Sequence, residues 1–244
     1  MTASKPENVI LVAFGGPSSS GKTTVAKTLA ALLPHVTLIH QDDFYLADSQ
    51  IPIDKASGYQ DWDCPEALNF DKFKKYLTVL KNGEGEPPID SIQPDDLDLK
   101  LLSNEIEAIK TIVKEHETKF NNGKQKHIYF IDGFMLFHDP EITNLFDVKL
   151  FFHASFATLK RRREARSGYN TVEGFWTDPP EYFEKIVWPA FESSHKYLFT
   201  NNDVEGQLNP KVATQYKIHD VKNEDGCKLI DLVTSALNII IHEI

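Results

Sequence analysis

Residues 9–24 read Val-Ile-Leu-Val-Ala-Phe-Gly-Gly-Pro-Ser-Ser-Ser-Gly-Lys-Thr-Thr. The first six of these residues are all apolar, which is typical of a strand buried on both faces of a parallel sheet. After the Gly/Ser turn, Val25, Leu29 and Leu32 fall on one side of a helix that a proline ends. The stretch therefore predicts a buried strand, a glycine-rich loop and an amphipathic helix.

The loop between this strand and helix, Gly16 to Thr23, fits the pattern G-x-x-x-x-G-K-[ST]. Its glycines let the backbone curl so that successive N–H groups point inward, and the helix N-terminus adds positive potential. In such a loop Lys22 reaches the β- and γ-phosphates of a nucleotide, and Thr23 holds Mg²⁺. We therefore predict a nucleoside triphosphate site; a nucleotide loop alone leaves kinase, GTPase and motor ATPase open. The guanine-reading pattern N-K-x-D and a γ-phosphate-sensing D-x-x-G are not clearly present.

The rest of the chain alternates strand and helix patterns. Further strands are predicted at Val36 to His40, Ile128 to Ile131, Val148 to Phe152 and near Tyr216 to Val221. Helices are predicted at Phe70 to Lys81, Leu97 to Lys119, Ser155 to Arg166, Glu181 to Tyr197 with a kink at Pro189, and Leu229 to Ile241. This order predicts an α/β fold with a doubly wound parallel sheet between two helical layers.

The length and net charge of the chain limit the number of domains and the kinds of partner that we expect. The 244 residues hold 26 Lys+Arg and 36 Asp+Glu, a formal net charge of −10, and 41% of them are hydrophobic. We expect one globular domain over residues 1–244, with an acidic, proline-containing surface insertion at 84–98. The negative charge argues against nucleic acid and anionic membranes as partners. It leaves monomer and homodimer equally open.

The cysteines and the first residues bear on the compartment. Cys64 and Cys227 are far apart in sequence and form no metal-binding pattern, which favours a reducing compartment and argues against a zinc site. Met1 to Asn8 are polar and the first apolar run is short, so we expect neither a signal peptide nor a membrane span. The cytoplasm is the expected location, with the nucleus not excluded.

Acidic residues close two of the predicted strands. Asp42 and Asp43 follow the second strand, and Asp132 follows the third. Because parallel strands end at one edge of a doubly wound sheet, these carboxylates are expected beside the phosphate loop, where they suit a metal-assisted phosphotransfer. A solvated turn or a helix cap is the competing interpretation, and for Asp43 capping is preferred.

Five basic residues lie within residues 160–166 of this otherwise acidic chain. Arg162 and Arg166 share a helix face, and guanidinium groups there can clamp a transferring phosphoryl group. The glycine and prolines that follow suit a hinged lid, which we place at about 160–180. A nucleic-acid patch or a solvated helix face is the alternative.

Trp62 and Asp63 lie in a loop after the second strand. Taken alone, Trp62 is more readily a core anchor. An aromatic ring joined to a carboxylate, however, offers what a nucleoside site needs: a π face for the base and two oxygens for the ribose hydroxyls.

Six motifs together resemble the nicotinamide riboside kinases, close to the fungal form, and less closely the uridine/cytidine kinases. They are G-x-x-x-S-G-K-T-T, Gln41-Asp42-Asp43-Phe44, Trp62-Asp63, Asp132-Gly133-Phe134, Leu159-Lys160-Arg161-Arg162-Arg163 and Asp178-Pro179-Pro180-x-Tyr182-Phe183. The resemblance covers roughly residues 9–199. It implies a P-loop nucleoside kinase that transfers the ATP γ-phosphate to the 5′-hydroxyl of nicotinamide riboside, giving nicotinamide mononucleotide for NAD synthesis.

The resemblance also implies roles for individual residues. ATP would be held by Gly16, Pro17, Ser18, Ser19, Ser20, Gly21, Lys22, Thr23, Thr24, Arg162 and Arg166. Mg²⁺ would be held by Thr23 and Asp42, and catalysis would involve Asp42, Lys22 and Asp132. The riboside would contact Asp42, Asp43, Phe44, Tyr45, Trp62, Asp63, Arg163 and Tyr169, with Trp62 and Tyr169 on the two sides of the pyridinium ring.

Several alternatives stay open at this level. Nicotinic acid riboside, uridine or cytidine could be the acceptor, and GTP could replace ATP. In the family the acid of the third strand is commonly Glu, so Asp132 here is shorter by one methylene, and either Asp42 or Asp132 could be the base. A protein of another class, an inactive nucleotide-binding regulator, is the remaining alternative.

Overall fold

A five-stranded parallel sheet forms the centre of the computed structural model, which describes residues 9–93, 99–120 and 126–244. The strands are β1 (Val9–Gly15), β2 (Val36–His40), β3 (His127–Gly133), β4 (Val148–His153) and β7 (Ile218–Lys222). Their spatial order is β2-β3-β1-β4-β7, and every pairing is parallel. The predicted doubly wound sheet is confirmed.

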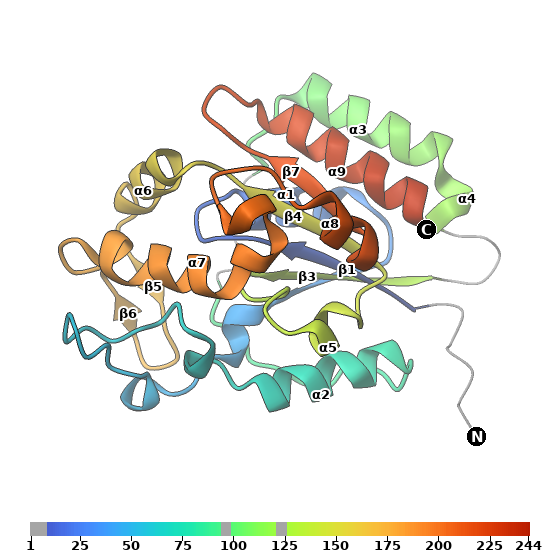
Figure 1. Cartoon of the computed structure of the whole chain (residues 1–244). Coiled ribbons are helices and arrows are strands. Elements are labelled where there is room, and N and C mark those ends of the chain that lie inside the picture. Colours follow the sequence, from blue (N-terminus) through green and yellow to red (C-terminus); the bar gives the residue numbers. More distant parts are fainter. Residues whose placement is uncertain (1–8, 94–98, 121–125) are drawn as a thin grey trace.

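Helices cover both faces of this sheet (Figure 1). One layer contains α1 (Lys22–Leu32), α3 (Ser103–Glu115), α4 (Glu117–Phe120) and α9 (Leu229–Glu243). The other contains α2 (Phe70–Lys81), α5 (Pro140–Thr143), α7 (Trp188–His195) and α8 (Pro210–Tyr216). None of the helices in the described ranges combines the length and hydropathy needed to span a bilayer.

Strand β1 explains why its sequence is apolar without alternation. Leu11 and Ala13 are buried in the core under α2 and α7, while Val12 and Phe14 are buried in the core under α1 and α9. Successive side chains of a strand point to opposite faces, and here both faces are covered. The uninterrupted apolar run is therefore the direct consequence of a two-sided core.

The strand register brings three strand ends to one edge of the sheet. Phe14 of β1 and His40 of β2 both pair with Asp132 of β3. The phosphate loop, the Gln41–Phe44 turn and the segment after β3 consequently begin side by side. This edge is where a doubly wound sheet binds its ligands.

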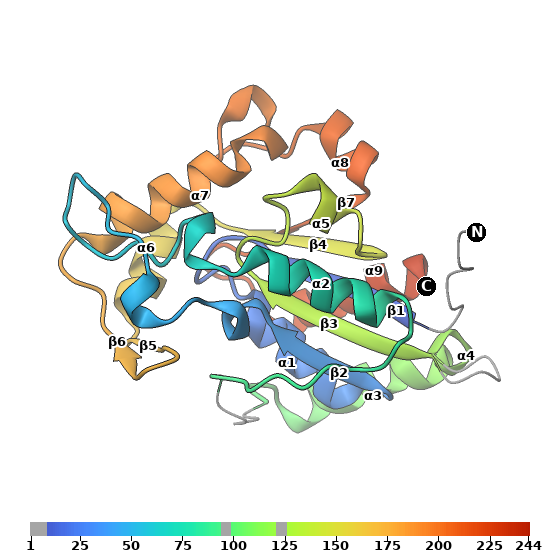
Figure 2. The same cartoon turned by 90° about the horizontal axis from the view of Figure 1, so that it is seen from below.

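A small lobe lies beyond that edge (Figure 2). It contains α6 (Phe156–Glu164) and a two-stranded hairpin, β5 (Tyr169–Asn170) with β6 (Phe175–Trp176), in which Tyr169 pairs with Trp176. The predicted lid region of residues 160–180 thus contains the end of α6 and this hairpin.

Two segments differ from the sequence-based expectation. The strand predicted near Tyr216 begins at Ile218, because Asn209 caps α8 and Pro210 is its first residue, so that Tyr216 ends a helix. The kink expected at Pro189 takes the form of a π-helical turn, Phe183–Val187, directly before α7. The predicted start of a helix at Leu97 lies outside the described residues, and α3 begins at Ser103.

Candidate active site

Glycines are required at two positions of the phosphate loop. Gly16 has φ +136°, and a Cβ there would lie 1.9 Å from the carbonyl oxygen of Phe152. Gly21 has φ +91°, and a Cβ there would lie 2.5 Å from Nδ2 of Asn223. Both positions combine a backbone conformation that favours glycine with a close neighbour. The loop consequently wraps tightly between β1 and α1.

The interior of the loop holds polar groups that lack protein partners. Ser19, with φ +66°, and Ser20 each bury a hydroxyl that has no hydrogen-bond partner among the described residues. Lys22 is 8% exposed, and its Nζ lies 3.5 Å from the carbonyl oxygen of Pro17. Burial lowers the pKa of Lys22, although Asp132 and Asp42 oppose that shift. A desolvated cation beside unpaired hydroxyls fits an anionic phosphate tail.

Asp132 at the end of β3 is a buried acid held from the β2 side. Its Oδ2 lies 3.1 Å from Nδ1 of His40, and its Oδ1 is buried with no hydrogen-bond partner among the described residues. Burial alone would raise the pKa of Asp132, but His40 and Lys22 outweigh it and lower the pKa. The Asp132 carboxylate is therefore charged, and its Oδ1 is available to bind a ligand.

The two acids after β2 have different surroundings. Oδ2 of Asp42 accepts a hydrogen bond of 2.8 Å from the Gln93 amide, and burial followed by the charge of Asp132 raises the pKa of Asp42 to about 6. Oδ1 of Asp43 accepts from the Ser91 hydroxyl at 3.0 Å and from the backbone N–H of Ile92 at 2.9 Å. Asp43 therefore anchors the insertion, whose residues 94–98 lie outside the described ranges.

These oxygens suit a Mg²⁺ ion that shares its ligands with a nucleotide. Carboxylates and a hydroxyl from Asp42, Asp132 and Thr23 are the hard donors that Mg²⁺ prefers, and Asp132 Oδ1 is an orphaned buried acceptor. In the parts of the chain that are described, no group of three or more His, Cys, Asp or Glu side chains forms a ready metal cage. Mg²⁺ held by one or two carboxylates, phosphates and water matches this pattern.

A cavity of about 320 Å³ connects the phosphate loop with the predicted nucleoside residues. Ser18, Lys22, Thr23 and Thr24 line its end at the phosphate loop. Its other walls include Asp42, Tyr45, Trp62, Asp63, Gln93, Phe134, Arg163, Arg166, Tyr169 and Trp176. Residues from both halves of the chain therefore meet around one space.

Asp63 and Arg163 form a buried ion pair in the wall of the cavity. Nη1 of Arg163 lies 3.2 Å from Oδ1 of Asp63, and both side chains are at least nine-tenths buried. Burial disfavours the charge of Arg163, but Asp63 and Asp178 hold its pKa well above its ordinary value. Burial also raises the pKa of Asp63, against the influence of Arg163. The pair offers a donor and an acceptor side by side, as a diol requires.

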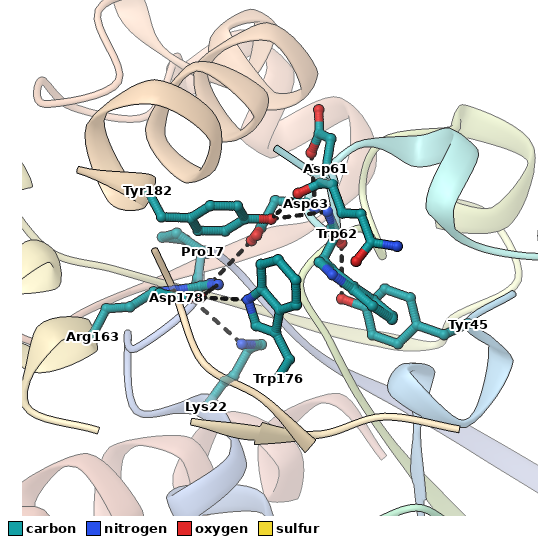
Figure 3. A network of polar contacts seen from close by, with 11 residues as sticks. Pro17, Lys22, Tyr45, Asp61, Trp62, Asp63, Arg163, Trp176, Asp178 and Tyr182 are labelled. Atoms are coloured by element: carbon teal, nitrogen blue, oxygen red, sulfur yellow. Dashed lines mark hydrogen bonds and ion pairs between the residues drawn. The ribbon is translucent and has the colours of Figure 1, made fainter. Parts of the chain in front are cut away.

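Aromatic rings surround the same end of the cavity. Trp62 is 5% exposed, with its ring centroid 5.4 Å from Tyr45 and 5.8 Å from Trp176. Its backbone N–H donates to the Tyr182 hydroxyl at 3.0 Å. Figure 3 shows Trp62 and Trp176 next to each other above Lys22. Trp62 is thus both packed in the core and part of the cavity wall.

The predicted partner of Trp62, Tyr169, lines the cavity but lies against two cations. The guanidinium carbon of Arg163 is 4.7 Å from the Tyr169 ring centroid, and that of Arg166 is 5.3 Å away. The ring that directly neighbours Trp62 from the β5–β6 hairpin is Trp176. The expected pair of rings, Trp62 and Tyr169, is thus joined in the cavity wall by a third ring, Trp176.

Nine predicted site residues are not among those that line the cavity: Gly16, Pro17, Ser19, Ser20, Gly21, Asp43, Phe44, Asp132 and Arg162. Three of these side chains, those of Asp43, Phe44 and Arg162, have partners elsewhere. Asp43 is occupied by the insertion, as described above. Phe44 is 1% exposed and packs edge-on against Phe73 and Tyr76 in the core. Arg162 points toward the end of β7, where its Nη1 donates to the carbonyl oxygen of Asn223 at 3.0 Å.

Sequence reasoning missed Gln93, Phe134, Trp176 and Asp178, which lie in or against this site. Phe134 and Asp178 belong to quoted motifs, so their motif membership was the available signal. Gln93 and Trp176 carried none, since an insertion and a short hairpin show no periodicity that would place a side chain.

Comparison with known proteins shows which sequences this chain is similar to. The description "Phosphoribulokinase / Uridine kinase family" belongs to the family whose profile matches residues 11–166. Nicotinamide riboside kinase of Saccharomyces cerevisiae is 40% identical over 89% of this chain and 89% of its own length. The Schizosaccharomyces pombe protein of that name is 41% identical over 83% of this chain and 86% of its own.

A third relative is similar over a longer span. Nicotinamide riboside kinase of Eremothecium gossypii is 35% identical over 95% of this chain and 92% of its own length. These alignments cover most of the chain and so extend well beyond the phosphate loop. The chain therefore belongs to the phosphoribulokinase/uridine kinase family and, within it, to the nicotinamide riboside kinases.

Proposed function

We propose that this protein transfers the γ-phosphoryl group of ATP to the 5′-hydroxyl of nicotinamide riboside, giving nicotinamide mononucleotide for NAD synthesis. The observation that supports it best is the single cavity that has Lys22 and Thr23 at one end and Asp42, Asp63 and Arg163 at the other. A donor phosphate and a ribose alcohol placed in it would meet beside Asp42. The relatives named above carry the same activity in their names.

On the donor side, the backbone of residues 16–24 binds the phosphate tail of ATP. Lys22 neutralises charge on the β- and γ-phosphates, and Arg166 lies in the cavity wall where it can contact the transferring group. Thr23 and Asp42 would hold Mg²⁺, with Asp132 close by. When bound, Mg²⁺ supplies charge neutralisation on the phosphates.

On the acceptor side, Asp63 and Arg163 bind the ribose hydroxyls, and Asp42 faces the 5′-hydroxyl. Phosphoryl transfer has a loose transition state, so positioning and charge stabilisation dominate and removal of the hydroxyl proton by Asp42 comes late. The pKa of Asp42, raised to about 6, leaves it ionised at neutral pH but a better base than an ordinary aspartate.

The aromatic walls favour nicotinamide riboside over uridine or cytidine. Nicotinamide riboside carries a pyridinium cation, and a cation against an aromatic face gains roughly 0.5 to 2 kcal/mol. A neutral pyrimidine base would gain no such contribution. The 160–180 segment, as a lid on a single kinase domain, closes this space in our proposal.

ATP consumption measured side by side with nicotinamide riboside, nicotinic acid riboside, uridine and cytidine tests the proposal. We expect nicotinamide riboside to give the highest kcat/KM. A higher kcat/KM for uridine or cytidine would instead show that the protein is a pyrimidine nucleoside kinase. ATP binding without turnover on any nucleoside would instead favour a regulatory protein.

A further inference from the structure

Asp178, which follows the β5–β6 hairpin, is bonded to two walls of the acceptor end of the cavity. Its Oδ2 accepts a hydrogen bond of 2.7 Å from Nε of Arg163, and its Oδ1 accepts one of 3.1 Å from Nη2. The same Oδ1 accepts a bond of 2.9 Å from the indole N–H of Trp176. Figure 3 shows Asp178 between these two side chains.

The bidentate contact fixes the direction of the Arg163 guanidinium group. A guanidinium is planar, so binding Nε and Nη2 to one carboxylate determines where Nη1 points. Nη1 is directed at Asp63, 3.2 Å away. Without Asp178, Arg163 would keep one carboxylate partner, Asp63. Its guanidinium group could then turn away from the ribose position by rotation about the side-chain bonds.

The indole bond fixes Trp176 against the other rings. The Trp176 ring centroid lies 5.8 Å from that of Trp62 and 5.6 Å from that of Tyr182. Trp176 belongs to a strand of two residues, and so short a hairpin is marginal without further contacts. The bond to Asp178 therefore ties this ring to the rest of the site.

We propose that Asp178 is a positioning residue for the nucleoside acceptor: it sets Arg163 and Trp176 together, so that the ribose clamp and the third ring wall form as one unit. The inference deepens the proposed function, because it takes the acceptor to be a nucleoside bound at this end. Asp178 itself does not line the cavity, so its effect on the acceptor passes through these two side chains.

The test compares KM values for the two substrates in Asp178→Ala, Asp178→Asn, Trp176→Phe and the Asp178→Ala/Trp176→Phe double variant. Loss of hydrogen bonds to a charged group predicts that Asp178→Ala raises KM for nicotinamide riboside about tenfold, with KM for ATP changed less than about twofold. Trp176→Phe keeps a ring but loses the N–H, and we expect about a threefold rise in the riboside KM. In the Asp178→Ala background, Trp176→Phe should raise the riboside KM by a smaller factor than it does alone, because the bond is already absent and only the smaller ring remains as a change.

Glu181→Gln is the matched control, since it neutralises an exposed carboxylate of the same loop whose partner is the surface residue Lys185. It should leave both KM values unchanged. Asp178→Asn, which keeps the shape and one acceptor oxygen, carries the test if Asp178→Ala does not fold; its riboside KM should rise about threefold. Equal rises for both substrates in the folded Asp178 variants, or independent effects in the double variant, would overturn the proposal.

Calorimetric titration with nicotinamide riboside separates this inference from the proposed function. If the unaltered protein binds the riboside without phosphorylating it, the proposed function fails, and the dissociation constants of the same variants replace the KM values. If the unaltered protein phosphorylates the riboside and Asp178→Asn and Asp178→Ala match it in riboside KM, the inference alone fails.

Discussion

Nδ2 of Asn223 donates a hydrogen bond of 2.8 Å to the carbonyl oxygen of Ser20, joining the segment after β7 to the phosphate loop across 203 positions of sequence. The same amide lies against Gly21, where it leaves no room for a side chain. Arg162 in turn donates to the carbonyl oxygen of Asn223. The donor end of the site is therefore braced from the C-terminal part of the chain.

Asn223→Ala should loosen the phosphate loop without touching the acceptor end. Removing a buried donor leaves the Ser20 carbonyl oxygen unpaired, which costs about 1 to 3 kcal/mol. We expect KM for ATP to rise several-fold, measured by steady-state kinetics at saturating riboside. The riboside KM in the same variant is the internal control, and a rise confined to it would contradict this role.

Lys22→Ala should abolish measurable turnover. Lys22 is the buried cation of the phosphate loop, and loss of such electrostatic stabilisation costs at least about a hundredfold in kcat. The measurement is ATP consumption with nicotinamide riboside at saturating substrate. An unchanged thermal unfolding midpoint shows that the loss is chemical, whereas retained turnover would remove Lys22 from the mechanism.

Asp42→Asn should cost much of the activity through lost metal binding and poor alignment of the 5′-hydroxyl. General-base contributions are typically about a hundredfold or more, and the metal contact adds to this. The substitution preserves shape, so single-turnover phosphorylation measures the chemistry directly. Full activity in this variant would defeat the assignment of Asp42.

Trp62→Ala should raise KM for the riboside more than KM for ATP, because the ring lies at the acceptor end of the cavity. Its loss removes a cation–π contact worth roughly 0.5 to 2 kcal/mol. The ring also packs against Tyr45 and Trp176, so the unfolding midpoint should fall as well. Equal changes in the two KM values would assign Trp62 to the core alone.

His195 should make the fold sensitive to acid. Burial lowers the pKa of His195 to about 3, so the folded protein keeps it neutral, while an unfolded chain protonates it near about 6.5. Below that pH the unfolded state binds the extra proton, and stability falls as pH drops. His195→Phe keeps a ring between Phe151 and Phe191. When the pH is lowered from 7.5 to 5.5, the thermal unfolding midpoint of the unaltered protein should therefore fall further than that of His195→Phe, by about 2 to 4 °C. Equal falls in the two proteins would show that His195 is not buried as a neutral ring.

The sheet was predictable because periodicity reports burial. The apolar run at Val9 to Phe14 required two covered faces, and the helix at Phe70 to Lys81 has the bounds that its periodicity and its Asn-Gly end indicated. Helix α8 was missed because only Asn209 and Pro210 mark it, and their capping role competes with an ordinary turn.

The site residues were predictable where a sequence motif fixes the local backbone geometry. They were less predictable where the cavity is lined by residues from loops and short hairpins. The phosphate loop, Asp42, Asp63 and Arg163 do meet around one cavity. Phe44 and Asp43 belong to the same motif as Asp42, yet a motif does not say which of its neighbouring side chains turns inward. Gln93 and Trp176 reach the cavity only through tertiary contacts that no local pattern encodes.

The hairpin of β5 and β6 contributes Tyr169 and Trp176 to the cavity, whereas Asn223 braces the phosphate loop, and this division has a practical consequence. Laboratory evolution aimed at new acceptors could be confined to residues 170–175, with the Asp178 contacts and nucleotide use left intact. A library of hairpins of different length and sequence, introduced there, would then test which alcohols are phosphorylated. The phosphate loop and its nucleotide site would stay unchanged.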